Sequence, residues 1–243
     1  MGATIHVAGE HETVSAIDPN WSSNTSLFFV SDISGYHNPW VFTFDPSDPS
    51  KTGKASPLVH TPIKEEFGAP QWWLSRHGCG ALSPTQIAFL SFRNGCSKLY
   101  IGDIAQRTLE EVQTPYAHIQ YMHGDGKGKV VMLGQRAEAG EVLTELTIDT
   151  HGKPQLTSLS PPPVENNTLP SSLISVGICQ EITLPPDNRT CYIIYYPPKN
   201  PNYHKGLLGE KPPVVVHIHG GPFFMSTANL DWSKQYFTSR GWA

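Results

Sequence analysis

The chain has 243 residues, of which 38% are hydrophobic and 10% aromatic, enough to build the core of one large domain or two ordinary ones. Its formal net charge is −4 and its 17 basic residues are scattered, which disfavours nucleic acid or an anionic membrane surface as a partner. No basic segment followed by an apolar run opens the sequence, and no stretch approaches the roughly 18 apolar residues of a membrane span, so we expect a cytoplasmic protein.

From about Trp21 to Thr150 the sequence predicts β-strands. Short apolar or alternating runs are separated by clusters of Gly, Pro, Asn, Asp and Ser, and a helical period of apolar residues is nearly absent. They fall into three rounds of strand, turn and strand. The clearest runs are Leu27–Val30, Trp40–Asp45, Gln86–Phe92, Lys98–Asp103, Lys129–Gly134 and Val142–Asp149.

The rounds repeat every 40 to 50 residues or so, roughly the spacing of the four-stranded blades of a β-propeller. We interpret Asp45, Asp103 and Asp149 as the ends of successive repeats, and Trp21, in Trp21–Asn24, and the pair Trp72–Trp73 as aromatic residues that pack one blade on the next. The predicted fold of residues 1–155 is therefore a partial β-propeller of about three to four blades. A generic β-sandwich is the alternative, because alternation is common to both folds.

A connector rich in Pro and Ser, residues 156–172, separates this part from a C-terminal part, residues 173–243. In the C-terminal part, Cys179–Leu184 and Cys191–Tyr196 predict a β-hairpin. The continuous apolar run Val214–Ile218 predicts a buried, parallel strand.

A short helix is predicted after the glycine turn that follows this strand. Asp231 is its candidate N-cap, Gly241 ends it, and Trp232, Tyr236 and Phe237 lie on one side. Strand, glycine turn and helix in this order predict the beginning of an α/β domain.

Five sequence blocks, taken with their order and spacing, carry a family resemblance over nearly the whole chain. They are Val30–Gly35, Glu66–Trp72, Tyr196–Pro201, His217–Pro222 and Gln235–Gly241. The chain resembles the prolyl oligopeptidase superfamily of serine peptidases, in its acylaminoacyl-peptidase and dipeptidyl-peptidase-like branch. The resemblance implies a β-propeller followed by an α/β-hydrolase domain, of which residues 173–243 would be the N-terminal portion.

The nucleophile of such an enzyme cannot be placed in this sequence. A serine hydrolase needs a nucleophile, a base, a group that orients the base, and donors for the developing oxyanion. In the family the serine lies in a G-x-S-x-G elbow, and the nearest approach here, Gly95–Leu99, has Leu99 in place of the second glycine. We therefore identify no catalytic residue and expect a truncated or fragmentary serine peptidase that is inactive alone.

The resemblance implies one part of the catalytic site, the oxyanion hole. The turn made by His219, Gly220, Gly221 and Pro222 would supply a backbone N–H, near Gly220 or Gly221, to the oxyanion hole. The alternative is a glycine turn that only leaves a buried strand.

Two adjacent carboxylates form a second candidate site. Glu65 and Glu66 resemble the paired glutamates with which some dipeptidyl peptidases hold the free amine of a substrate, because a carboxylate suits an ammonium group. A solvated acidic turn before a blade is the interpretation that the charge pattern favours.

We expect no metal ion and no cofactor. His217 and His219 could point to one face of a strand as metal ligands do, but the sequence offers no recognisable further ligands. The glycine-rich run Gly124–Lys129 resembles a phosphate loop, yet it precedes a strand instead of opening a helix, and so predicts an ordinary loop.

The four cysteines are Cys79, Cys96, Cys179 and Cys191. They show no C-x-x-C spacing and are too few to cross-link a chain of this length. We expect them to be small buried hydrophobic residues in a reducing compartment.

The resemblance implies short peptides or acyl-peptides as the substrates of complete family members. Whether this chain is itself an enzyme is not decided by its sequence. One alternative is a non-catalytic binding or regulatory module that uses the propeller surface and pairs with a full-length relative. Another is a part, wrongly bounded, of an active aminopeptidase-type serine hydrolase.

Overall fold

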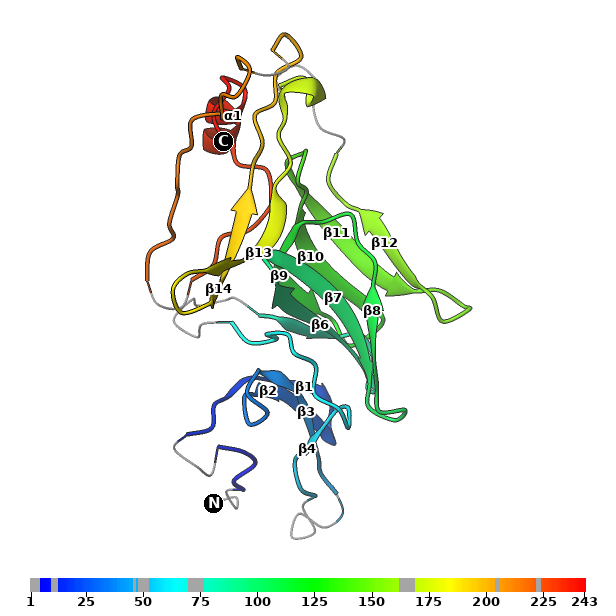
Figure 1. Ribbon diagram of the computed structural model, residues 1–243. Helices are drawn as coiled ribbons and strands as arrows, with labels where there is room; N and C mark the ends of the chain where they lie inside the picture. The colour runs from blue at the N-terminus through cyan, green and yellow to red at the C-terminus, as the bar shows by residue number, and fades with distance from the viewer. Residues whose placement is uncertain are drawn as a thin grey trace.

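The computed structural model describes residues 5–9, 13–45, 47, 53–69, 77–161, 169–203, 206–221 and 224–243. Within these ranges the chain forms three four-stranded antiparallel sheets, a two-stranded hairpin and one α-helix. In Figure 1 the sheets follow one another from blue to light green, and the helix lies at the opposite end of the view from the N-terminus.

Each sheet pairs its strands in chain order, because short connections favour antiparallel neighbours. The first sheet contains β1 (Ala16–Ser23), β2 (Ser26–Ser31), β3 (Asn38–Thr43) and β4 (Ser56–Pro57). The second contains β5 (Cys79–Ala81), β6 (Gln86–Arg93), β7 (Cys96–Asp103) and β8 (Thr108–Val112). The third contains β9 (His118–Gly124), β10 (Lys129–Gln135), β11 (Glu141–Ile148) and β12 (Pro154–Ser158). The three predicted rounds are confirmed, and the arrangement is consistent with a partial β-propeller.

The packing of strand β6 explains why its run Ile87–Leu90 is apolar on both faces. Successive side chains of a strand point to opposite faces of the sheet. Phe89 packs toward the first sheet, where its ring meets that of Phe28 edge-on with the centroids 5.8 Å apart, whereas Ala88 and Leu90 pack toward the third sheet. The second sheet is therefore covered on both faces, as an inner blade of a propeller is.

The core lies between successive sheets as two separate clusters. The cluster between the first and second sheets contains Phe28, Val30, Val41, Leu58, Phe67, Cys79, Ala81, Ile87, Phe89 and Tyr100. The cluster between the second and third sheets contains Leu82, Ala88, Leu90, Leu99, Val112, Tyr116, Ile119, Met122, Val130, Met132, Val142 and Leu146.

The first strands of the sheets contact one another in succession, β1 with β5 and β5 with β9. Between β5 and β9 the contact is made by backbone, since a Cβ on Gly124 would overlap the carbonyl oxygen of Ala81. The Gly126 N–H donates to that same oxygen at 3.0 Å. The glycine-rich run is thus an ordinary loop, as predicted, and its glycines allow two sheets to approach closely.

The predicted repeat ends are wrong in position. Asp103 is the last residue of β7 and Asp149 follows β11, and each carboxylate accepts hydrogen bonds from backbone amides of the turn that leads to the fourth strand. Asp45 likewise follows β3 and precedes β4. Apolar periodicity misses the fourth strands because β8 and β12 are short and carry polar residues at most positions, as outer edge strands do.

Two sequence features fall wholly or partly outside the described residues. The pair Trp72–Trp73 is one, and residues 162–168 of the predicted connector are the other. The third sheet extends to Ser158, so it includes the first three residues of the segment expected to be a connector.

The hairpin and the helix of the C-terminal part are confirmed. Strand β13 (Ile178–Leu184) pairs with β14 (Arg189–Tyr195) in antiparallel register, after a short 3-10 helix at Ser171–Leu173. Helix α1 (Trp232–Thr238) begins at Asp231, whose carboxylate accepts from the Ser233 N–H at 2.9 Å. With 7 residues, this helix is far too short to cross a bilayer.

The buried strand predicted at residues 214–218 is not formed. Val214, Val216 and Ile218 are 62%, 75% and 80% exposed. A parallel strand is buried only where other strands flank it and helices cover it. Within the described residues the backbone of this segment pairs only with Ala243, which donates to the Pro213 oxygen and accepts from the Val215 N–H, both at 2.8 Å. The described part of the chain therefore contains no α/β sheet.

Candidate functional site

The glycine loop that follows this segment is open to solvent. Gly220 and Gly221 are exposed, and a Cβ on either would meet no atom within 4 Å. Gly221 has φ +73°, which glycine adopts without strain. Among the described residues neither amide has a hydrogen-bond acceptor, so both N–H groups can point to a ligand.

An oxyanion hole also needs a shielded setting and a nucleophile near its donors. The described residues around the loop supply neither, and Pro222 lies outside them. His217 and His219 are exposed, and no group of three or more His, Cys, Asp or Glu residues within the described ranges could hold a metal ion.

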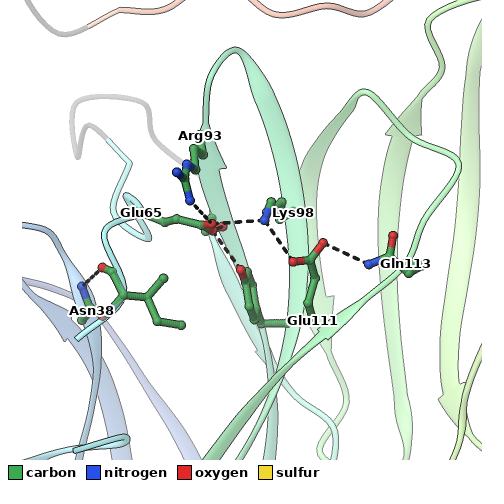
Figure 2. Close-up of polar contacts among 9 residues, drawn as sticks. Asn38, Glu65, Arg93, Lys98, Glu111 and Gln113 are labelled. Carbon is green, nitrogen blue, oxygen red and sulfur yellow. Dashed lines mark hydrogen bonds and ion pairs between the residues drawn. The ribbon is translucent and has the colours of Figure 1, made fainter. Parts of the chain in front are cut away.

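Glu65 is buried, and the interpretation of a solvated acidic turn is wrong for it. Its residue exposure is 3%, although it lies in the connection between the first and second sheets. The Ser91 hydroxyl donates to its Oε2 at 2.6 Å and the Tyr100 hydroxyl donates to the same atom at 3.0 Å. Figure 2 shows the carboxylate enclosed by side chains of β6 and β7.

Two cations complete this enclosure. Lys98 Nζ lies 3.2 Å and an Arg93 guanidinium nitrogen 3.6 Å from Glu65 Oε1. Lys98 also forms a 2.9 Å ion pair with Glu111, to which Gln113 donates a further hydrogen bond (Figure 2). Both oxygens of Glu65 therefore have partners from the chain itself.

The contacts keep Glu65 ionised. Burial raises its pKa, but the hydrogen bonds from Ser91, Lys98 and Tyr100 outweigh burial and hold the pKa below its ordinary value. The pKa of Lys98 is raised, chiefly by its hydrogen bond to Glu111. Burial, and then the bond to Glu65, raise the pKa of Tyr100 to about 12. A substrate ammonium would have to displace Lys98 to reach this carboxylate.

Glu66 has different partners. Its Oε1 lies 2.6 Å from His37 Nδ1 and accepts the Gly68 N–H at 3.0 Å. The hydrogen bond to Glu66 raises the pKa of His37 above its ordinary value, against the opposing effect of burial. The two adjacent carboxylates thus contact separate groups, Glu65 on β6 and β7 and Glu66 beside β3.

A serine–histidine contact was not anticipated from the sequence. Ser97 Oγ lies 2.8 Å from His118 Nδ1 and accepts the Ile119 N–H at 3.1 Å. The distance between Ser97 Oγ and His118 Nδ1 is typical of a nucleophile and its base. However, Ser97 is only 5% exposed and His118 only 3%. Packed between β7 and β9, the pair joins two sheets and offers no access to a substrate. Ser97 lies in Gly95–Leu99, which the sequence had already excluded as an elbow.

The cysteines differ from the expectation. Only Cys79 is buried; Cys96, at the start of β7, and Cys179 and Cys191, on the two strands of the hairpin, are partly exposed. None forms a disulfide. Cys96 Sγ lies 3.7 Å from Cys179 Sγ, a contact between residues 83 positions apart.

Three successive four-stranded antiparallel sheets, packed on one another through two core clusters, define a propeller-type protein. Solved structures support that class. A puromycin-hydrolysing peptidase of Mycobacterium tuberculosis matches with a TM-score of 0.75 and 26% identity, over 94% of this chain and 33% of that one. A puromycin hydrolase matches with a TM-score of 0.75 and 25% identity, over 94% of this chain and 32% of that one.

Oligopeptidase B from Leishmania major matches over 94% of this chain and 30% of that one, with a TM-score of 0.61 and 13% identity, a likeness of fold alone. These neighbours are prolyl oligopeptidase family members, so the resemblance read from the sequence is confirmed. The chain spans about a third of the length of the structures it matches. No protein-family model matches the chain, and a comparison with curated proteins finds no match.

Proposed function

We propose that residues 1–243 are part of a serine peptidase of the prolyl oligopeptidase superfamily that cleaves short peptides or acyl-peptides. In this proposal residues 1–155 form part of the β-propeller, residues 156–172 connect the two domains, and residues 173–243 are the N-terminal portion of the α/β-hydrolase domain. The observation that carries it is the match to two puromycin hydrolases, which extends over 94% of the chain and so includes its C-terminal segment.

The backbone around Ala243 supports the hydrolase assignment. Its two hydrogen bonds, to the Pro213 oxygen and from the Val215 N–H, have the pattern of parallel strands. Helix α1 lies between the paired segments in sequence, and parallel strands are usually joined through a helix. In the proposed enzyme, Val214–Ile218 becomes a central strand once further strands flank it.

The glycine loop then takes the oxyanion role. Gly220 and Gly221 have exposed amides without acceptors among the described residues, which fits donors that await a ligand. Amine binding by Glu65 has less support, since its oxygens are occupied by Ser91, Tyr100 and two cations.

These 243 residues contain no G-x-S-x-G elbow, so the proposal requires the nucleophile to lie outside them. We expect no turnover by the 243-residue chain on aminoacyl or acyl-aminoacyl chromogenic substrates, and no labelling by a fluorophosphonate probe. The transcript downstream of the Ala243 codon should encode the elbow, and its longer product should be labelled and active.

Labelling of a serine in the 243-residue chain would overturn the assignment of the nucleophile. A transcript that encodes no elbow would overturn the peptidase proposal. It would favour a non-catalytic module instead, for which the measurement is co-purification with a full-length relative.

A further inference from the structure

The turn between β6 and β7 lies against the C-terminal hairpin. Asn94 and Gly95 form the turn, with φ of 51° and 75°, as a tight two-residue hairpin turn requires. A Cβ on Gly95 would lie 2.8 Å from Ile194 Cδ1 of β14 and 3.5 Å from the Cys179 sulfur of β13. The Gly95 oxygen also accepts the Ala228 N–H at 3.2 Å. The second sheet and the hairpin are therefore held in close contact.

This contact brings two thiols together. Cys96 is the first residue of β7 and Cys179 the second residue of β13, and their sulfur atoms are 3.7 Å apart. A disulfide has an S–S distance of about 2.05 Å, so the sulfurs must approach by less than about 2 Å. Rotation of the side chains can supply a movement of that size without separating the sheet from the hairpin. Both residues are partly exposed, so a small oxidant can reach them.

We propose that Cys96 and Cys179 are a thiol–disulfide site that covalently joins the second sheet to the C-terminal hairpin under peroxide. One thiol, as its thiolate, attacks hydrogen peroxide to give a sulfenic acid and water. The second sulfur then attacks the sulfenic sulfur, the S–S bond forms and a second water leaves. Two thiols are oxidised by two electrons, one peroxide is reduced to two waters, and a dithiol reductant reverses the reaction.

The surroundings of Cys179 agree with a pair that stays reduced until an oxidant arrives. Burial, and then the neighbouring Cys96, raise the pKa of Cys179 to about 11, so at neutral pH it is a thiol. The remaining two cysteines are natural controls. Cys79 is fully buried between the first and second sheets, and Cys191, on the strand beside Cys179, has no thiol in contact among the described residues.

The consequence of the bond is mechanical. The hairpin β13–β14 now rests on the second sheet through non-covalent contacts and can open locally. A disulfide between Cys96 and Cys179, which are 83 positions apart, prevents β13 from separating from β7. It therefore removes the conformations in which the hairpin has left the second sheet. The oxidised protein should therefore hold its C-terminal part on the sheets more firmly than the reduced one.

The test uses the full chain and three variants, Cys96→Ser, Cys179→Ser and the matched control Cys191→Ser. After hydrogen peroxide and a quench, free thiols are counted in denaturant and peptides are mapped without reductant. We expect the wild type and Cys191→Ser to lose two thiols and to yield the Cys96–Cys179 peptide, and the other two variants to form no intramolecular disulfide. Hydrogen exchange of the β13–β14 amides should slow by about 10-fold or more in the two proteins that cross-link.

Several outcomes would overturn the proposal. They are a cross-link through Cys191, disulfides only between molecules, sulfinic acids without a disulfide, or unchanged exchange of the hairpin in cross-linked protein. Peptide mapping of the wild type needs no variant, so the result stands even if one serine substitution prevents folding.

Discussion

The three sheets and the C-terminal region differ in where their strands find partners. Every strand that the structure describes between residues 13 and 161 pairs with a neighbour in sequence, and both core clusters lie between these sheets. In the C-terminal region the equally apolar segment Val214–Ile218 is exposed and pairs only with Ala243 among the described residues. An apolar sequence is therefore not sufficient for burial, because a parallel strand depends on partners that lie far along the chain.

The largest expected effect on stability comes from comparing a buried residue of the sheets with an exposed residue of the C-terminal region. Phe89 is fully buried and touches two aromatic rings, so Phe89→Ala should lower the free energy of unfolding by about 3–5 kcal/mol. Val216 is 75% exposed, so Val216→Ala should change it by less than about 0.5 kcal/mol. Urea denaturation measures both. Similar losses in the two variants would mean that residues 214–218 are buried in solution.

The second prediction concerns the buried charge of the sheet region. Glu65→Ala leaves the buried hydroxyls of Ser91 and Tyr100 without their acceptor, and should cost about 2–4 kcal/mol. Glu110→Ala, at an exposed position of β8, is the matched control and should cost less than about 0.5 kcal/mol.

The pH dependence of this cost has a definite sign. The pKa of folded Glu65 is held below its ordinary value of 4.5, so its contribution is present above that pH and is lost as pH falls through the folded value. The difference between wild type and Glu65→Ala should shrink in acid. A difference that grows in acid would contradict the ion-pair assignment.

The third prediction concerns the C-terminal region, where buried side-chain hydrogen bonds hold helix α1 in place. The Gln235 side chain is fully buried, accepts the Ser175 N–H at 2.7 Å and donates to the Ser175 oxygen at 3.0 Å. Gln235→Ala should cost about 2 kcal/mol and speed hydrogen exchange of α1. Trp232→Ala, on the half-exposed side of the same helix, should do neither. Equal effects would show that apolar packing holds the helix.

The smallest effect is expected at His37. Its pKa in the folded protein is raised above the ordinary 6.5 by the bond to Glu66, so its contribution is complete below pH 6.5 and is lost as pH rises through the folded value. The loss of stability in His37→Ala should be larger at pH 5.5 than at pH 8.5, by about 0.5–1 kcal/mol. Thermal melts of the wild type and the variant at the two pH values measure this difference.

The features that the sequence predicts well depend on local signals. Strand periodicity, the turn residues around Pro185–Arg189 and the cap at Asp231 act over a few residues, and the structure confirms the corresponding elements. The fourth strands were missed for the same reason, since the polar edge strands β8 and β12 carry little apolar signal.

The candidate sites depend on contacts between residues far apart in the sequence, and the sequence predicts such contacts less well. Glu65 looks like an acidic turn because its partners Ser91 and Tyr100 lie 26 and 35 positions away. Likewise, the thiols of Cys96 and Cys179 have no spacing that would pair them. The glycine loop was found only through family resemblance, because two adjacent glycines occur in many turns.

The chain-order pairing of the sheets bears on how the protein is made. A growing polypeptide leaves the ribosome from its N-terminus, so each four-stranded sheet can form as soon as its four strands have emerged. Val214–Ile218 has no such option, since the residue with which it pairs, Ala243, is synthesised later. During that interval its bare valines and isoleucine are a natural target for a chaperone.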